Sequence, residues 1–94
     1  MPNEDEPPFP KRGMRDIVVQ VGRLASQLEI EGDLTMFISV GSEGKADGFS
    51  ILSAPSPEMA KAVAFIFYKT DFKPAICGGK ACPGEFPFRI RLER

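Results

Sequence analysis

The most constraining feature of the sequence is a strict alternation of apolar and other side chains near the C-terminus. Over residues 86–93, every second residue is large and apolar, and the residues between them are charged or proline. The apolar set is Phe86, Phe88, Ile90 and Leu92, and the other set is Pro87, Arg89, Arg91 and Glu93. A period of two predicts a β-strand with one buried face, which needs a second layer to cover it. Because Pro87 has no amide hydrogen, this strand either lies at a sheet edge or starts late.

Two further strands are predicted in the middle of the chain. Residues 34–40 place apolar side chains on one face, and residues 49–54 form a second short and mainly apolar segment. The loop 41–48 between them contains three glycines and several charged residues. This pattern favours a hairpin with a long turn.

Two other segments carry apolar residues at helical spacing. In residues 14–29 the apolar side chains form one stripe, which predicts a helix, while three valines leave a strand over 17–21 as an alternative. Residues 56–69 begin with a Ser-Pro pair, a favourable N-cap followed by a favourable first helical residue. A helix is expected there too, and the short apolar run 62–68 leaves a buried strand as the alternative.

The element order predicts an α+β fold in two layers: helix, strand, strand, helix, irregular loop, strand. A three-stranded, mainly antiparallel sheet with both helices on one face would bury every apolar stripe. The chain has 94 residues, so residues 13–94 are expected to form one small domain with a thin core. A small open sheet has exposed edges, and these favour dimerisation.

Residues 1–12 differ in composition from the rest of the chain. They contain four prolines and three acidic residues but only one aromatic residue, Phe9. We expect a disordered acidic arm, with a polyproline II docking peptide at residues 7–10 as the alternative. The remaining charge is uneven, because basic residues outnumber acidic ones from residue 61 to 94.

The chain contains no histidine. Histidine-dependent catalysis and histidine metal sites are therefore excluded, and no nucleophile–base pair is apparent. We expect a non-enzymatic protein without a cofactor. The first residues are acidic where a signal peptide would be basic and then apolar, and no segment has the roughly 20 apolar residues of a transmembrane helix. A cytoplasmic protein that does not bind membranes is expected.

The two cysteines, Cys77 and Cys82, flank the sequence Gly-Gly-Lys-Ala. Their spacing departs from the Cys-x-x-Cys redox motif and from zinc knuckles. We interpret them first as small buried residues or as an incidental disulfide. Two alternatives stay open. One is a thiol switch, in which Lys80 stabilises a thiolate, and the other is a metal site shared between two chains.

The second predicted helix has apolar residues on both sides. Phe65 and Tyr68 fall opposite its core-facing side, and Phe72 follows shortly after the helix. These three aromatic residues are predicted to anchor a protein partner, with Arg89 and Arg91 as charged contacts at the rim. The alternative is that the irregular segment after the helix folds back over the aromatic residues and completes the core.

Together these features favour a small intracellular protein–protein interaction module, such as a regulator or an inhibitor. It would bind another protein or associate with itself as a homodimer. The alternative from another class is a nucleic-acid-binding domain that uses the basic C-terminal half. The net charge of −1 argues against a dedicated nucleic-acid-binding protein, because such proteins are usually strongly basic.

Overall fold

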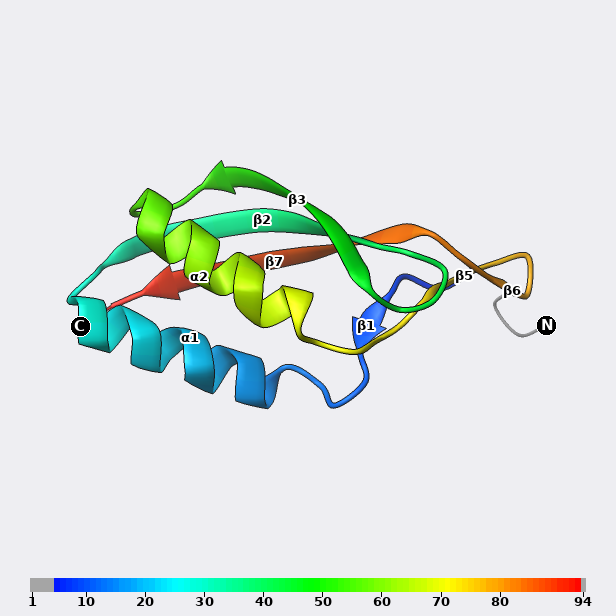
Figure 1. Cartoon of the computed structure of the whole chain (residues 1–94), viewed down its shortest axis with the longest axis horizontal. Helices are drawn as coiled ribbons and strands as arrows, with labels where there is room; N and C mark the ends of the chain where they lie inside the picture. The colour runs from blue at the N-terminus through cyan, green and yellow to red at the C-terminus, as the bar shows by residue number, and fades with distance from the viewer. Residues whose placement is uncertain (1–4, 94) are drawn as a thin grey trace.

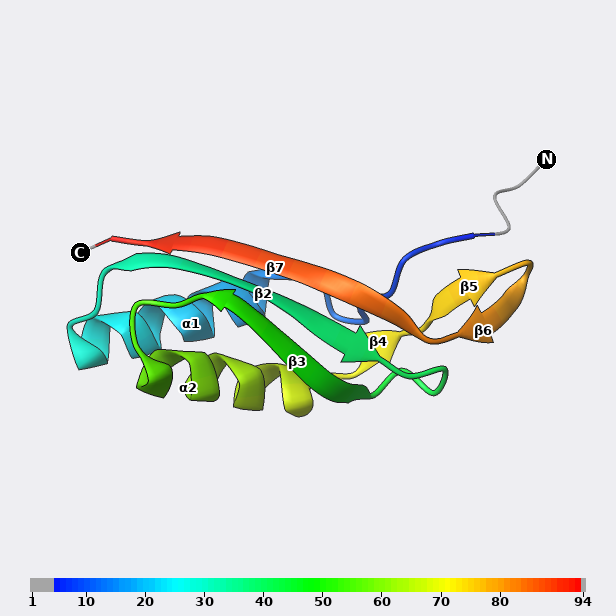
Figure 2. The ribbon, with the colours of Figure 1, turned by 90° about the horizontal axis from the view of Figure 1, so that it is seen from above.

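The computed structural model describes residues 5–93. Its elements in chain order are β1 (Phe9–Pro10), α1 (Arg15–Leu28), β2 (Gly32–Val40), β3 (Ala46–Ser53), α2 (Pro57–Tyr68), β4 (Phe72–Lys73), β5 (Ala75–Cys77), β6 (Lys80–Cys82) and β7 (Gly84–Leu92). Three long strands form one antiparallel sheet in the order β3–β2–β7. Both helices cover the same face of this sheet (Figures 1 and 2). The predicted two-layer α+β fold is thereby confirmed.

Strand β2 is the centre of the sheet, with β3 and β7 as its neighbours. Met36, for example, lies opposite Ile51 of β3 and opposite Phe88 of β7. The residues of β2 that face the helices are all fully buried, with 0–1% of their surface exposed: Leu34, Met36, Ile38 and Val40. Strand β7 lies at an edge of this sheet and begins before Pro87, so of the two alternatives left by the proline the edge position is the one observed.

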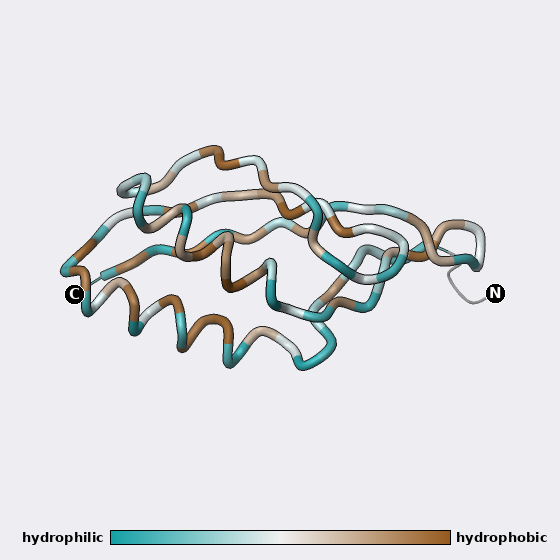
Figure 3. The backbone as a smooth tube through the Cα atoms, viewed as in Figure 1, coloured by the Kyte–Doolittle hydropathy of each residue, from teal (hydrophilic) through white to brown (hydrophobic). Residues whose placement is uncertain are grey.

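The hydrophobic core fills the space between the sheet and the two helices. Hydrophobic residues recur along α1 with hydrophilic ones between them, which is the pattern of a helix with one buried face (Figure 3). The buried residues of the two helices are Ile17, Val21 and Ala25 of α1 and Met59, Ala60, Val63 and Phe67 of α2. The ring centroid of Phe67 lies 4.9 Å from that of Phe88 and 6.2 Å from that of Phe72.

Both segments with helical spacing form helices, so the strand alternatives for residues 17–21 and 62–68 are wrong. Helix α2 begins as its sequence predicts. The Ser56 hydroxyl accepts a hydrogen bond of 3.1 Å from the amide of Met59, and Pro57 is the first helical residue.

Residues 5–12 are packed against the rest of the chain, which corrects the expectation of a disordered arm. Glu6 and Ile76 exchange two backbone hydrogen bonds of 2.9 Å, and β1 pairs with β4. Residues 1–4, the remainder of the predicted arm, lie outside the described residues.

Three side chains of this segment explain why it is held in place. Pro8 and Pro10 have less than 2% of their surface exposed, and the ring of Phe9 meets that of Phe86 edge-to-face at 5.8 Å. Proline loses little side-chain entropy when it is buried, and its fixed backbone angle suits a short edge strand. Although its proline-rich composition is typical of disorder, this segment is held in place by apolar contacts, including one to the aromatic ring of Phe86.

The tip of the β2–β3 hairpin docks on the segment that follows α2. The carbonyl of Gly44 accepts a hydrogen bond of 2.9 Å from the amide of Phe72. Beside it, Lys45 forms a backbone bridge and an ion pair with Asp71. The hydrogen bond from Lys45, together with its charge, holds the pKa of the Asp71 carboxyl below its ordinary value.

This docking makes position 44 intolerant of any side chain. Gly44 has a φ of +83°, and a Cβ atom there would lie 2.3 Å from the carbonyl oxygen of Phe72. We expect Gly44→Ala to lower the free energy of unfolding by about 2 kcal/mol or more. Gly22→Ala is the control, because that site inside α1 is open, and it should raise the free energy by about 0.5–1 kcal/mol. Urea unfolding measures both, and a Gly44→Ala protein of wild-type stability would contradict the docking.

Candidate functional site

The outward face of α2 carries two large exposed aromatic residues. Met59, Val63 and Phe67 recur every four residues and are fully buried, so the orientation of the helix is fixed. Phe65 and Tyr68 lie on the other side of the helix, with 58% and 62% of their surfaces exposed. The structure thus leaves both residues accessible to a partner.

A lysine accompanies the aromatic pair. The ammonium of Lys69 lies 5.1 Å from the centre of the Phe65 ring, within the range of a cation–π contact. Lys61 is one turn before Phe65, and its side chain is also exposed. Aromatic residues are enriched at the centres of protein–protein interfaces, which polar side chains surround at the rim.

The neighbouring strand β3 extends this surface. Ser50, Ile51, Leu52 and Ser53 are all exposed, and Ile51 and Leu52 expose 44% and 61% of their surfaces. Helix α2 contacts β3, to which it is joined by a short turn (Figure 1). We call Ile51, Leu52, Phe65 and Tyr68 the α2–β3 flank.

Sequence reasoning assigned residues 49–54 to a strand but did not select Ile51 and Leu52 as site residues. One signal could have identified them. The segment from Gly48 to Ser53 contains no charged residue and no proline, which is unusual for a strand at a sheet edge. Which strand would lie at the edge could not be read from the sequence.

Phe72 does not belong to the aromatic surface, which corrects the prediction that it anchors a partner. It is 1% exposed and packs against Phe67 and Phe86 in the core. Its strand, β4, pairs with β1, with Phe72 opposite Pro10, which is also buried. The segment after α2 continues toward β5 and β6 at the far end of the molecule and leaves Phe65 and Tyr68 exposed (Figure 2).

The two predicted rim arginines are not near the aromatic pair. In β7, Phe86 and Phe88 face the helices and are buried, so the alternation places Arg89 and Arg91 on the opposite face of the sheet. Phe65 and Tyr68 belong to the helical layer. One flat partner therefore cannot contact both sets, and the predicted combined site is wrong.

The sheet face with the arginines is mixed in charge rather than basic. A guanidinium nitrogen of Arg91 lies 3.7 Å from Asp33 on β2, and another lies 3.1 Å from Glu93. Glu85 shares this face by the same alternation. A nucleic-acid backbone would have to displace these carboxylates before it could use Arg91.

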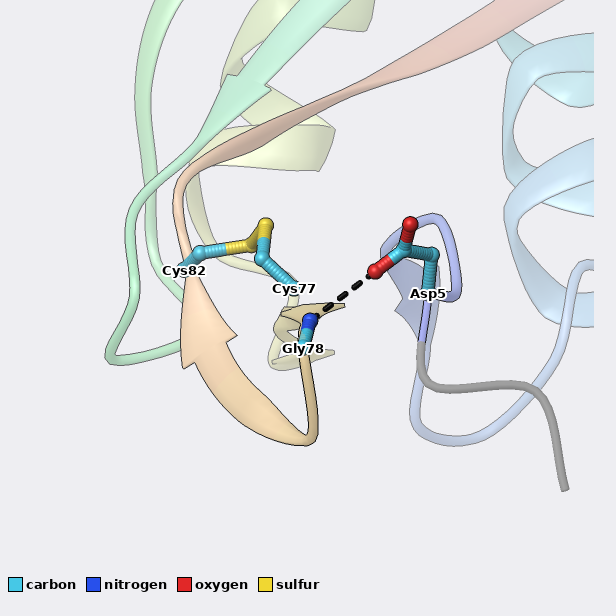
Figure 4. The surroundings of a disulfide bond; sticks show 4 residues. All are labelled: Asp5, Cys77, Gly78 and Cys82. Atoms are coloured by element: carbon cyan, nitrogen blue, oxygen red, sulfur yellow. Dashed lines mark hydrogen bonds between the residues drawn. A yellow bond between two sulfur atoms is a disulfide. The ribbon is translucent and has the colours of Figure 1, made fainter.

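Cys77 and Cys82 form a disulfide that closes the β5–β6 hairpin (Figure 4). Gly78 and Gly79 form its two-residue turn, with φ values of 55° and 82° that suit glycine. The amide of Gly78 donates a hydrogen bond of 2.9 Å to the Asp5 carboxylate, so the N-terminal segment reaches this turn. Bonded cysteines offer no thiolate to a metal, and residues 5–93 contain no cluster of three or more metal-binding side chains.

A cavity of about 510 Å3 lies between the N-terminal segment, the start of α1 and the end of α2. Its charged lining residues carry both signs: Lys11, Arg12, Asp16, Lys69 and Asp71. Asp71 is paired with Lys45, which holds the pKa of its carboxyl below the ordinary value. Catalytic general acids usually have raised pKa values, so the direction of this shift does not favour Asp71 in that role.

Comparison with known proteins gives no family assignment: no family model matches the chain, and no curated protein is significantly similar to it in sequence. Within the described residues, neither helix is long and apolar enough to cross a membrane. The geometry of the site is therefore the basis for any functional conclusion.

We expect the disulfide to stabilise only its own hairpin, so that the protein folds without it. It spans only five positions of the chain and lies in a hairpin at one end of an elongated molecule, 46 Å in its longest dimension. Closing so short a loop is worth about 2 kcal/mol at most in the chain-entropy model. Cys77→Ser/Cys82→Ser should therefore stay folded and lose less than this in urea unfolding, and a protein that no longer folds would contradict a local role.

Proposed function

We propose that this protein is a small non-enzymatic protein–protein interaction module that associates with itself through the α2–β3 flank. The observation that carries the proposal is the pair Phe65 and Tyr68, which are more than half exposed on a helix whose other side is fully buried. Neither aromatic residue contributes to the core cluster, so the fold alone does not account for their size or their apolar character.

The free energy gained by burying apolar side chains supports the α2–β3 flank as the docking surface. Burial of a large aromatic side chain contributes about 1.5–3 kcal/mol, and aromatic residues are frequent among the few residues that dominate binding energy. The second exposed pair, Ile51 and Leu52, lies on the strand next to α2. A partner that covers the outer side of α2 and the neighbouring edge of β3 would bury apolar surface of both elements.

The cellular location belongs to the same proposal. We place the protein in the cytoplasm, where glutathione and thioredoxin keep thiols reduced, so the Cys77–Cys82 bond is expected to be present as two thiols there. Intact-mass measurement on protein isolated after thiols are blocked in the cells tests this. Alkylation of both cysteines is expected, and a fully oxidised pair would contradict a reducing location.

Replacement of the aromatic pair tests the docking surface. We expect wild-type protein to show concentration-dependent association in sedimentation velocity, and Phe65→Asp/Tyr68→Asp to remain monomeric, because two carboxylates would have to be desolvated at the interface. Both residues are exposed, so the free energy of unfolding should change by about 0.5 kcal/mol or less.

The matched control is Val18→Asp/Val19→Asp, which alters an exposed apolar pair on α1, 42% and 48% exposed, without touching the flank. It should associate as the wild type does. If the aromatic double variant unfolds, these residues are structural. If it associates normally, or if the wild type remains monomeric throughout, the proposed function is wrong.

A further inference from the structure

The two edges of the central sheet are protected very differently. Strand β7, at one edge, carries Pro87 and three charged residues, which are features that prevent pairing with another strand. Strand β3, at the other edge, has neither charge nor proline from Gly48 to Ser53. Proteins usually protect an edge strand with charge, proline or bulges, and β3 has only the two irregular positions at its ends, so its middle is the part of the sheet most open to pairing.

The outer side of β3 is open for such pairing. Among residues 5–93, β3 has β2 as its only strand neighbour, so the backbone amides and carbonyls on its other side point away from the sheet. The register with β2 is regular from Gly48 to Ile51, between two irregular positions at the ends of the strand. A regular stretch of four residues is long enough to begin a ladder with another strand.

We propose that β3 pairs with β3 of a second copy of this chain, in antiparallel orientation, to form a continuous six-stranded sheet. This inference rests on the proposed self-association and specifies which element mediates it. In this dimer a two-fold axis relates the two copies. Each copy therefore contributes the same segment, and the two paired strands run in opposite directions.

The uncharged, apolar sequence of β3 from Gly48 to Ser53 indicates that the strand it pairs with is another copy of β3. A neutral apolar strand is matched by another neutral apolar strand, and this segment supplies one without any like-charge contact at the centre. The nearest charged residue is Asp47, at the start of the regular stretch. With the axis near Ser50, the two Asp47 side chains lie at opposite ends of the paired segment and do not repel each other.

The position of α2 supports the same arrangement. Ile66 lines a groove with residues of α1, including Gln20 and Leu24, so this side of α2 faces α1. Tyr68 is two residues further, about 200° around the helix, and therefore lies on the side away from α1, toward the β3 edge. Pairing of two β3 strands brings the two α2 helices next to each other on one face of the sheet.

This arrangement also accounts for the exposure of Ile51. Ile51 lies opposite the fully buried Met36 in the register of the sheet, so it faces the helical layer, yet 44% of its surface remains exposed at the open edge. In the paired sheet, the second copy covers that edge. The proposed dimer contact thereby buries apolar residues of both α2 and β3.

Ile51→Lys tests the pairing, because it places two ammonium groups close to the two-fold axis. We expect the dimer dissociation constant to rise by more than about tenfold in sedimentation equilibrium. Val19→Lys is the control, since it makes the same change at a residue of similar exposure on α1, and it should dimerise like the wild type.

Hydrogen exchange of the wild-type protein provides a second readout that needs no variant. Within residues 48–53, the amides that point away from β2 should be protected at high protein concentration and lose that protection on dilution, whereas the amides bonded to β2 should stay protected at both concentrations. If Ile51→Lys still dimerises, or if the amides that point away from β2 exchange equally at both concentrations in a dimer that Phe65→Asp/Tyr68→Asp disrupts, the strand pairing is wrong and the proposed function stands. A wild-type protein that is monomeric at every concentration overturns both.

Discussion

The structure depends on the aromatic cluster around Phe67. This side chain is fully buried and packs against Phe86 and Phe88 of β7 and against Phe72 of β4, with centroid distances of 4.9–6.2 Å. It joins α2 to the edge strand of the sheet and to the short strand that follows the helix. Because one face of α2 is thereby fixed inward, the rotation of the helix is determined, and Phe65 must point away from the core.

The same cluster organises the end of the molecule that carries the short strands. Phe72 and Phe86 form a surface on which Phe9 and the neighbouring prolines pack, and this holds the N-terminal segment against the domain. The segment then extends along β5 to the disulfide-closed hairpin. The docking flank and the hairpin are therefore fixed to one core, although they lie in different parts of the molecule.

Much of the fold could be predicted from local patterns. The alternation over residues 86–93 and the Ser-Pro start of α2 depend on neighbouring residues alone, and both lead to the observed elements. Phe65 and Tyr68 were selected for the same reason, because the helical period separates them from the core-facing residues. Pairing between segments that are far apart in the sequence could not be predicted from these local patterns. The burial of Phe72 and the order of the N-terminal segment both depend on contacts between β1 and β4, which are far apart in sequence.

The candidate site was predicted in part. The predicted two-layer fold already places Arg89 and Arg91 on the sheet face that the helices leave uncovered, so their grouping with Phe65 and Tyr68 of the helical layer was inconsistent with that fold. Strand order could not be read from the sequence. The structure shows that β3 lies at an edge, and only this position makes its uncharged segment the strongest candidate for a contact with another chain.

The central claim is that α2 divides its aromatic residues between core and surface. Single alanine substitutions on the same helix, compared by urea unfolding of dilute monomeric protein, test it most directly. Phe67→Ala should lower the free energy of unfolding by about 3–5 kcal/mol, and Phe65→Ala by less than about 1 kcal/mol. Equal losses at the two positions would show that Phe65 supports the core and would contradict the account.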